Sequence, residues 1–284
     1  MTLIRRTLFA KLTVLAALGL ALLAGCVTQP PGSMSRAQKE SNLNRGSASG
    51  DLATSSDDSE SRRRARIRLE LASAYFAQGQ LNTALDEVKQ ALVIDPRFSD
   101  AYDLRGLIYS ALGEFAKAED SFKRAIEMDA RNGSALHNYA WMLCGSQQYP
   151  AADALFAQAA NFPQSVVLSK TLLARGVCQI RSGLFAEAEK TLIRAYEMDP
   201  SSPATAFNLA SVLFRRGEYE RARFYVRRVN NVPEQITAES IWLGIRIENK
   251  LNNISGRDEL SSILRSRFPN SKEAAALEAG RIDE

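Results

Sequence analysis

The sequence predicts an all-α fold, a right-handed superhelical solenoid of six repeated helix pairs closed by a C-terminal capping helix. The first observation is a set of small residues that recurs with spacings of 34, 34, 36, 34 and 34 residues, at Ala84, Ala118, Ala152, Ala188, Ala222 and Gly256. The second is a parallel set upstream, at Ala72, Gly106, Ala140, Gly176, Ala210 and Gly244. The third is that no strand-like alternation of apolar and polar residues competes with the helical periodicity.

Each repeat is expected to pair two antiparallel helices that approach closely because both carry a small residue at the crossing. An apolar residue follows four positions after each small residue of the second helix, which is helical spacing. Glycines such as Gly79 and Gly113 are expected to end the first helix in the left-handed conformation. The third repeat lacks this glycine, and Gly145 is expected to serve instead. A period of 34 residues is that of the tetratricopeptide repeat.

The repeat domain is predicted at residues 63–284. Its repeats are expected at residues 65–98, 99–132, 133–166, 169–202, 203–236 and, in degenerate form, 237–270. Residues 271–284 are expected to form the polar-faced cap that a solenoid requires at its end.

The N-terminal residues have the features of an export signal. Basic residues precede an uncharged apolar run, residues 12–25, which is shorter than the ~20 residues that span a bilayer. Leu23-Ala24-Gly25-Cys26 resembles the lipobox of bacterial lipoproteins, which implies removal of residues 1–25 and acylation of Cys26. The alternative is a plain signal peptide with an incidental cysteine. Val27 after the cysteine favours the outer membrane in the sorting rule of such lipoproteins.

Residues 26–62 are predicted to be the lipidated cysteine and a disordered tether. Residues 27–62 contain nine serines, three glycines and few large apolar side chains, so they cannot bury enough surface to offset their ordering entropy. A flexible coil of this length reaches ~30–36 Å root-mean-square. The arginine-rich run Arg62–Arg68 follows, and it is either a solvated first helical turn or a contact for anionic lipid or an acidic partner.

Composition argues against nucleic-acid binding and against catalysis. The net charge of +4 falls to +1 when residues 1–25, with three cations and no acid, are removed, and no basic stripe remains. His137 is the single histidine, which excludes multi-histidine metal centres. No oxyanion-hole motif accompanies it. We therefore expect no catalytic residue, metal, cofactor or small-molecule substrate.

Two cysteines, Cys144 and Cys178, remain besides Cys26. Export places them in an oxidising compartment, where disulfides persist, and they lie 34 residues apart on the first helices of adjacent repeats. A disulfide between them is one expectation. Two buried free thiols are the alternative.

Four segments of the chain resemble the type IV pilus biogenesis and stability lipoproteins. They are SALHNYAWMLCGSQQY (residues 134–149), ARGVCQIRSGLFAEAE (174–189), SIWLGIRIENKL (240–251) and SRFPNSKE (266–273). That family combines a lipobox, a tether and tetratricopeptide repeats, so the resemblance covers essentially the whole chain. It implies a non-catalytic adaptor, lipid-anchored to the outer membrane and facing the periplasm, whose partner is the pilus secretin or another pilus assembly protein. The alternative is a general scaffold lipoprotein that organises other envelope proteins, such as cell-wall hydrolases.

The resemblance also implies a partner-binding groove on the concave surface made by the first helices. The repeat positions place eight residues on or beside it: Phe76, His137, Asn138, Trp141, Phe207, Asn208, Phe214 and Ile245. Aromatic residues in a groove are the anchors that dominate binding energy; for Trp141 and Phe207, packing between helices is the alternative. Asn138 and Asn208 occupy one repeat position, where an amide can hydrogen-bond to a partner's backbone.

Overall fold

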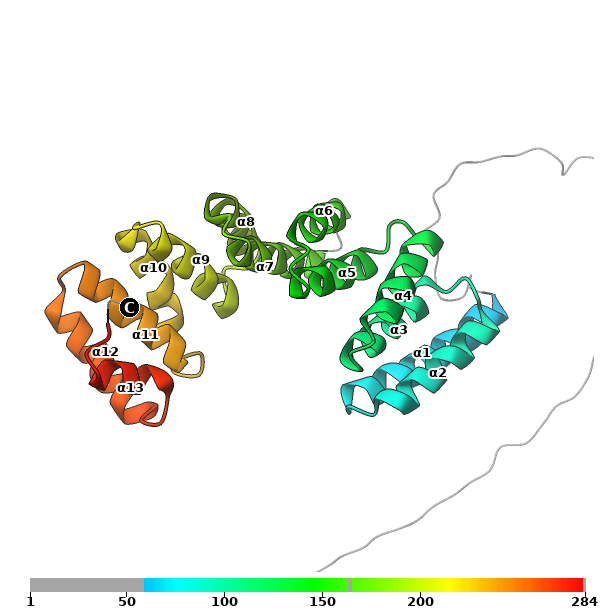
Figure 1. Ribbon diagram of the computed structural model, residues 1–284, viewed down its shortest axis with the longest axis horizontal. Coiled ribbons are helices and arrows are strands. Elements are labelled where there is room, and N and C mark those ends of the chain that lie inside the picture. The colour runs from blue at the N-terminus through cyan, green and yellow to red at the C-terminus, as the bar shows by residue number, and fades with distance from the viewer. Residues whose placement is uncertain (1–58, 163–164, 283–284) are drawn as a thin grey trace, which may run out of the picture. The chain divides into compact units, whose positions relative to one another are not determined.

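The computed structural model describes residues 59–162 and 165–282, and all of their regular structure is helical (Figure 1). The all-α prediction is confirmed. The helices are α1 (Glu60–Ala77), α2 (Leu81–Ile94), α3 (Ser99–Ala111), α4 (Phe115–Met128), α5 (Gly133–Gly145), α6 (Tyr149–Ala159), α7 (Ser165–Arg181), α8 (Phe185–Met198), α9 (Pro203–Arg215), α10 (Tyr219–Asn230), α11 (Ala238–Lys250), α12 (Ile254–Arg267) and α13 (Lys272–Glu278). Cys26, the predicted signal peptide and most of the predicted tether lie outside the described residues.

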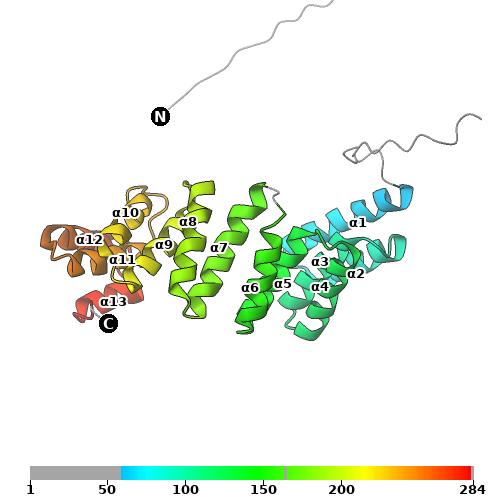
Figure 2. The same ribbon diagram turned by 90° about the horizontal axis from the view of Figure 1, so that it is seen from above.

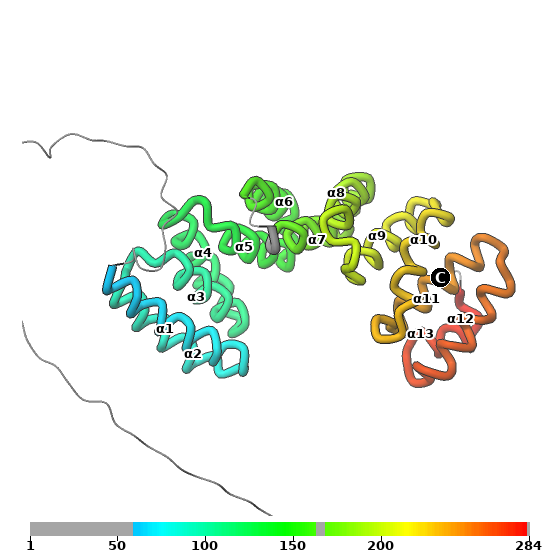
Figure 3. Tube along the Cα trace, turned by 180° about the vertical axis from the view of Figure 1, so that it is seen from behind, coloured from blue at the N-terminus to red at the C-terminus, as the bar shows by residue number. Residues whose placement is uncertain are grey.

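The helices form consecutive antiparallel pairs, α1 with α2 through α11 with α12 (Figures 2 and 3). Each first helix also contacts the first helix of the next pair, so α1, α3, α5, α7, α9 and α11 make one continuous face. We call this the first-helix face. The short helix α13 packs on α11 and α12.

The small residues allow the two helices of a pair to approach closely. A Cβ atom added at Gly106 would lie 2.5 Å from the Phe122 ring, and one added at Gly176 would lie 2.6 Å from Leu192. Both distances are shorter than real non-bonded carbon–carbon contacts, so a larger residue at either glycine would displace Phe122 or Leu192. The two partner side chains are fully buried, which shows how the 34-residue spacing becomes core packing.

The turn within each pair has a Schellman pattern with one residue at positive φ. In the first repeat, Gly79 has φ +74° and the Gln80 N–H donates to the Tyr75 carbonyl. The expectation for the third repeat was wrong. Gly145 is still helical, and Gln147 takes the left-handed conformation instead, with φ +62°. The backbone hydrogen bonds of the motif impose this conformation on a residue that does not favour it.

Three element boundaries differ from the sequence-based expectation. Helix α1 begins at Glu60, inside the predicted tether, because the Ser59 side chain caps the N–H of Arg62. Helix α7 begins at Ser165, which places part of the longer spacing before the fourth repeat inside a helix. Helix α13 ends at Glu278, before the predicted end of the cap.

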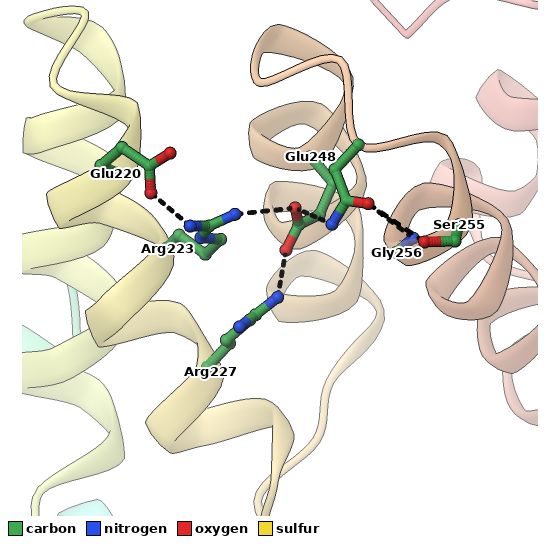
Figure 4. Close-up of polar contacts among 7 residues, drawn as sticks. Glu220, Arg223, Arg227, Glu248, Ser255 and Gly256 are labelled. Carbon is green, nitrogen blue, oxygen red and sulfur yellow. Dashed lines mark hydrogen bonds and ion pairs between the residues drawn. The ribbon is translucent and has the colours of Figure 1, made fainter.

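A buried carboxylate joins the last repeats (Figure 4). Glu248 on α11 is only 3 % exposed and accepts hydrogen bonds from Arg227 of α10 (2.9 Å) and from the Asn253 amide (2.8 Å). Arg223 lies 3.7 Å from Oε2, the same oxygen that accepts from Asn253. Asn253 in turn caps the N–H of Gly256 at the start of α12. One carboxylate therefore connects three successive helices.

Candidate binding groove on the first helices

A pocket of about 390 Å³ opens on the first-helix face of the third to fifth repeats. We call it the tryptophan pocket; its lining includes His137 and Trp141 from α5, Leu173 and Val177 from α7, and Ala204 and Asn208 from α9. The Trp141 side chain is 42 % exposed, and the Arg181 guanidinium lies 5.0 Å from its ring centroid. An exposed indole beside aliphatic side chains is the kind of anchor that carries binding energy in protein interfaces.

A second pocket of about 540 Å³ is lined by α1, α3, α5 and α7 together with the turn after α4 and the C-terminal end of α6. We call it the acidic pocket, because Asp100, Asp103 and Asp129 line it and Arg131 is the one cation among the described residues of its lining. The Arg131 guanidinium faces the Phe162 ring, 5.8 Å from its centroid. The lining therefore carries an excess of negative charge.

Asp103 is the buried member of this group. Asp103 is only 8 % exposed. Both of its carboxylate oxygens accept hydrogen bonds from the Asn138 amide at 3.0 Å. Burial raises the pKa of Asp103 from 3.8 to about 6, against the lowering effect of the Asn138 hydrogen bond, and the nearby charge of Asp100 adds to the rise. No cation forms an ion pair with Asp103 within the described ranges. The carboxylate is thus buried with only a neutral partner.

A hydrogen bond separates the two pockets. The His137 Nδ1 atom and the Thr171 hydroxyl lie 3.0 Å apart, with His137 lining the tryptophan pocket and Thr171 lining the acidic pocket. The imidazole also packs edge-on against Phe156. Burial lowers the pKa of His137 below its usual value, so the ring is neutral at neutral pH. These contacts hold the His137 ring in the wall between the two pockets.

The structure brings together some of the sequence-predicted groove residues. His137, Trp141 and Asn208 line one pocket, and Asn138 supports the carboxylate in the other. The two asparagines are not equivalent, since the Asn208 amide donates to the Ala204 carbonyl of its own helix (2.8 Å). Phe76, Phe207 and Phe214 line neither pocket; they are half-buried against the core.

The expectation for Ile245 was wrong. Its side chain is fully buried and packs with Ile241, Leu264 and Leu277. Helix α13 covers α11 here, so this part of the first-helix face is closed.

Sequence reasoning missed Asp103, Lys170, Leu173 and Val177. A usable signal existed for Asp103, which precedes His137 by one 34-residue period and so occupies the same position on its first helix. The α7 residues fall just after the irregular spacing, where the repeat register is hardest to place.

Cys144 and Cys178 are joined by a disulfide with a Cα–Cα distance of 5.9 Å. Both residues are buried, and the bond links α5 to α7. It therefore fixes the two helices that supply most of the tryptophan pocket.

Within the part of the chain that the structure describes, Arg62, Arg63 and Arg68 of the run Arg62–Arg68 form ion pairs. Arg62 pairs with Asp95, the residue that caps the C-terminal end of α2, and its guanidinium lies 4.5 Å from the centroid of the Phe98 ring. Arg68 pairs with Glu87 (2.8 Å), and Arg63 pairs with a glutamate one turn away. These contacts account for much of the cluster as part of the helix surface.

The described part of the chain offers neither a metal site nor a membrane-spanning helix. No group of three His, Cys, Asp or Glu side chains is arranged to hold a metal ion in residues 59–162 and 165–282. Within those same ranges, every helix is too short or too polar to cross a membrane.

Comparison with known families identifies the repeats. The profile described as "TPR repeat" matches residues 72–113, and two profiles described as "Tetratricopeptide repeat" match residues 99–132 and 173–231. The repeats at these positions are therefore tetratricopeptide repeats.

Within that class, the chain is homologous to type IV pilus biogenesis proteins. It is 23% identical over 211 residues to the type IV pilus assembly protein PilF of Pseudomonas aeruginosa, covering 74% of this chain and 83% of the relative. The crystal structure of PilW, described as a widely conserved type IV pilus biogenesis factor, superposes with a TM-score of 0.68 at 27% identity, covering 76% of this chain and 98% of PilW. The structure of P. aeruginosa PilF has a TM-score of 0.69 at 23% identity, over 77% and 99% of the two chains, and shares the fold.

Proposed function

We propose that this protein is a non-catalytic adaptor in type IV pilus biogenesis, which holds a segment of a pilus assembly protein on its first-helix face. The likeness to PilF and PilW over nearly their whole lengths carries the proposal. The tryptophan pocket supplies the means, because it offers an exposed indole beside apolar side chains from three successive repeats. A helix or extended peptide laid across these helices would bury its apolar residues there.

The proposal includes an anchor at Cys26 and a place at the periplasmic side of the outer membrane. The lipobox-like residues 23–26 and the serine-rich segment that follows support it. A binder tethered to that membrane is suited to a secretin, whose subunits must reach the membrane and multimerise. Assistance to secretin localisation or multimerisation is therefore the proposed role.

Deletion of the gene tests the role in pilus biogenesis. The deletion strain should lose surface pili and pilus-driven motility, and secretin monomers should accumulate. Normal piliation together with normal secretin multimers would end the pilus proposal.

A point variant tests the groove. Trp141→Ala should reproduce part of the deletion phenotype, because it removes the exposed anchor of the tryptophan pocket. Phe224→Ala is the matched control, since Phe224 is an aromatic residue of similar exposure (53 %) on a second helix, α10. Circular dichroism should show both variants folded. An equal loss of piliation in the two variants would contradict the groove assignment.

The anchor is tested by fractionation. Cys26→Ala should move the protein from the membrane fraction to the soluble fraction, and mass spectrometry of the mature wild-type chain should find an acylated N-terminal cysteine. Unchanged membrane association of Cys26→Ala would refute the anchor and leave the groove proposal standing.

A further inference from the structure

The acidic pocket carries negative charge that the fold does not neutralise. Asp100, Asp103 and Asp129 face it, and no ion pair joins any of them to Arg131 in the part of the chain that the structure describes. Other acidic residues of similar burial do have cations: Glu248 is 3 % exposed and contacts two arginines. Asp103, 8 % exposed, has the Asn138 amide as its one hydrogen-bond partner among the described residues. A buried carboxylate without a cation is costly, and a ligand cation entering the pocket would remove that cost.

The acidic pocket adjoins the tryptophan pocket. Thr171 and His137, hydrogen-bonded to each other, belong to the linings of the two pockets, and Ser134 and Trp141 of α5 line one pocket each. A single extended or helical segment that crosses α5 therefore reaches both. Lys170 lines the tryptophan pocket and Arg181 lies over its indole ring. These two cations repel a basic partner residue from the tryptophan pocket. A basic residue of the partner is therefore accommodated in the acidic pocket.

We propose that the acidic pocket binds a lysine or arginine side chain of the partner segment whose apolar residue enters the tryptophan pocket. The inference rests on the proposed groove function and adds the chemistry of the partner: a peptide segment with a basic residue close to an apolar one. The negative charge of the pocket and the buried carboxylate of Asp103 favour a lysine or arginine side chain over an acidic or purely apolar one.

A random peptide library displayed on phage, panned against the purified full-length chain, tests the proposal. Peptides selected by the wild-type chain should share a lysine or arginine near an apolar residue. Their affinity should fall at least ~10-fold for D100N/D103N/D129N, because a charge-assisted contact to a buried group is lost. The matched control is D86N/D120N/E127Q, which removes the same charge from exposed positions on second helices and should leave the affinity unchanged.

A charge-reversed variant distinguishes a loss of peptide binding caused by the missing charge from one caused by misfolding. Asp100 is exposed at the pocket, so Asp100→Lys should fold and should select peptides that are acidic at the position where the wild-type chain selects a basic residue. Misfolding cannot produce such a switch.

The outcomes separate the two proposals. Selected peptides without a basic residue, or equal affinity in the pocket and control variants, would overturn the inference and leave the groove function in place. If the wild-type chain selects no peptide whose binding is weakened by Trp141→Ala, the result would count against the groove function itself. Self-association of the chain that D100N/D103N/D129N abolishes would assign the pocket to a second copy and overturn the inference.

Discussion

The buried carboxylate of Asp103 should make the free protein less stable at neutral pH than it would be with a neutral side chain. The pKa of this group is raised to about 6 from an ordinary 3.8, chiefly by burial. A difference of that size corresponds to about 3 kcal/mol of free energy favouring the protonated form in the folded state. Asp103→Asn keeps the shape and an acceptor for Asn138 but has no charge. We expect it to raise the free energy of unfolding at neutral pH by about 1–3 kcal/mol.

The stability difference between Asp103→Asn and the wild-type chain should depend on pH, and the direction of that dependence is a second test. Between about pH 4 and pH 6 the folded chain holds a proton on Asp103 that the unfolded chain has already released, so the stability contribution of Asp103 falls as pH rises through this window. The advantage of Asp103→Asn should therefore be near zero at about pH 4 and should reach its full value above about pH 6. Urea unfolding followed by far-ultraviolet circular dichroism, with both chains at each pH, measures the difference directly.

Asp120→Asn is the matched control, because Asp120 is on a second helix with its side chain 80 % exposed. It should show no such pH-dependent difference from the wild-type chain. A second check is Asp100→Asn, which removes the neighbouring charge that helps to raise the Asp103 pKa and should reduce the effect. If Asp103→Asn destabilises the chain equally at about pH 4 and at neutral pH, the carboxylate is compensated in the fold and the reasoning fails.

Three further predictions concern stability. Gln147→Gly should raise the free energy of unfolding by about 0.5–1 kcal/mol in urea unfolding, because Gln147 has φ +62°; a destabilised variant would contradict this. Glu248→Ala should lower the free energy of unfolding by about 2 kcal/mol, because two arginines and an amide lose a buried acceptor. Glu220→Ala is the control: its side chain is 66 % exposed, and the change should stay within about 0.5 kcal/mol. Equal losses of stability in the two variants would refute the distinction. Thiol titration of the denatured, unreduced chain should find no free thiol at Cys144 or Cys178, and replacing both with alanine should cost about 3 kcal/mol; two free thiols would exclude the bond.

The sequence by itself determined the repeat architecture. The small residues recur because every helix pair solves the same packing problem, and the clash that a Cβ atom at Gly106 would make with Phe122 shows that the solution is steric. Such contacts join residues within one repeat, so their spacing in the chain reports their contact in space. The same local logic predicted Trp141 and His137 on the first-helix face, and both line the tryptophan pocket.

Only the tertiary structure decided which positions of that face remain open and which are charged without a partner. Ile245 has the spacing of a groove residue, yet α13 covers it, because the end of the stack breaks the repeat pattern. Gln147 takes positive φ where no glycine is available, because the hydrogen bonds of the turn outweigh its own preference. Asp103 shares the repeat position of His137, but its burial and its lack of a cation depend on side chains from neighbouring repeats. Burial and charge pairing arise from contacts between elements, and a one-dimensional period does not encode them.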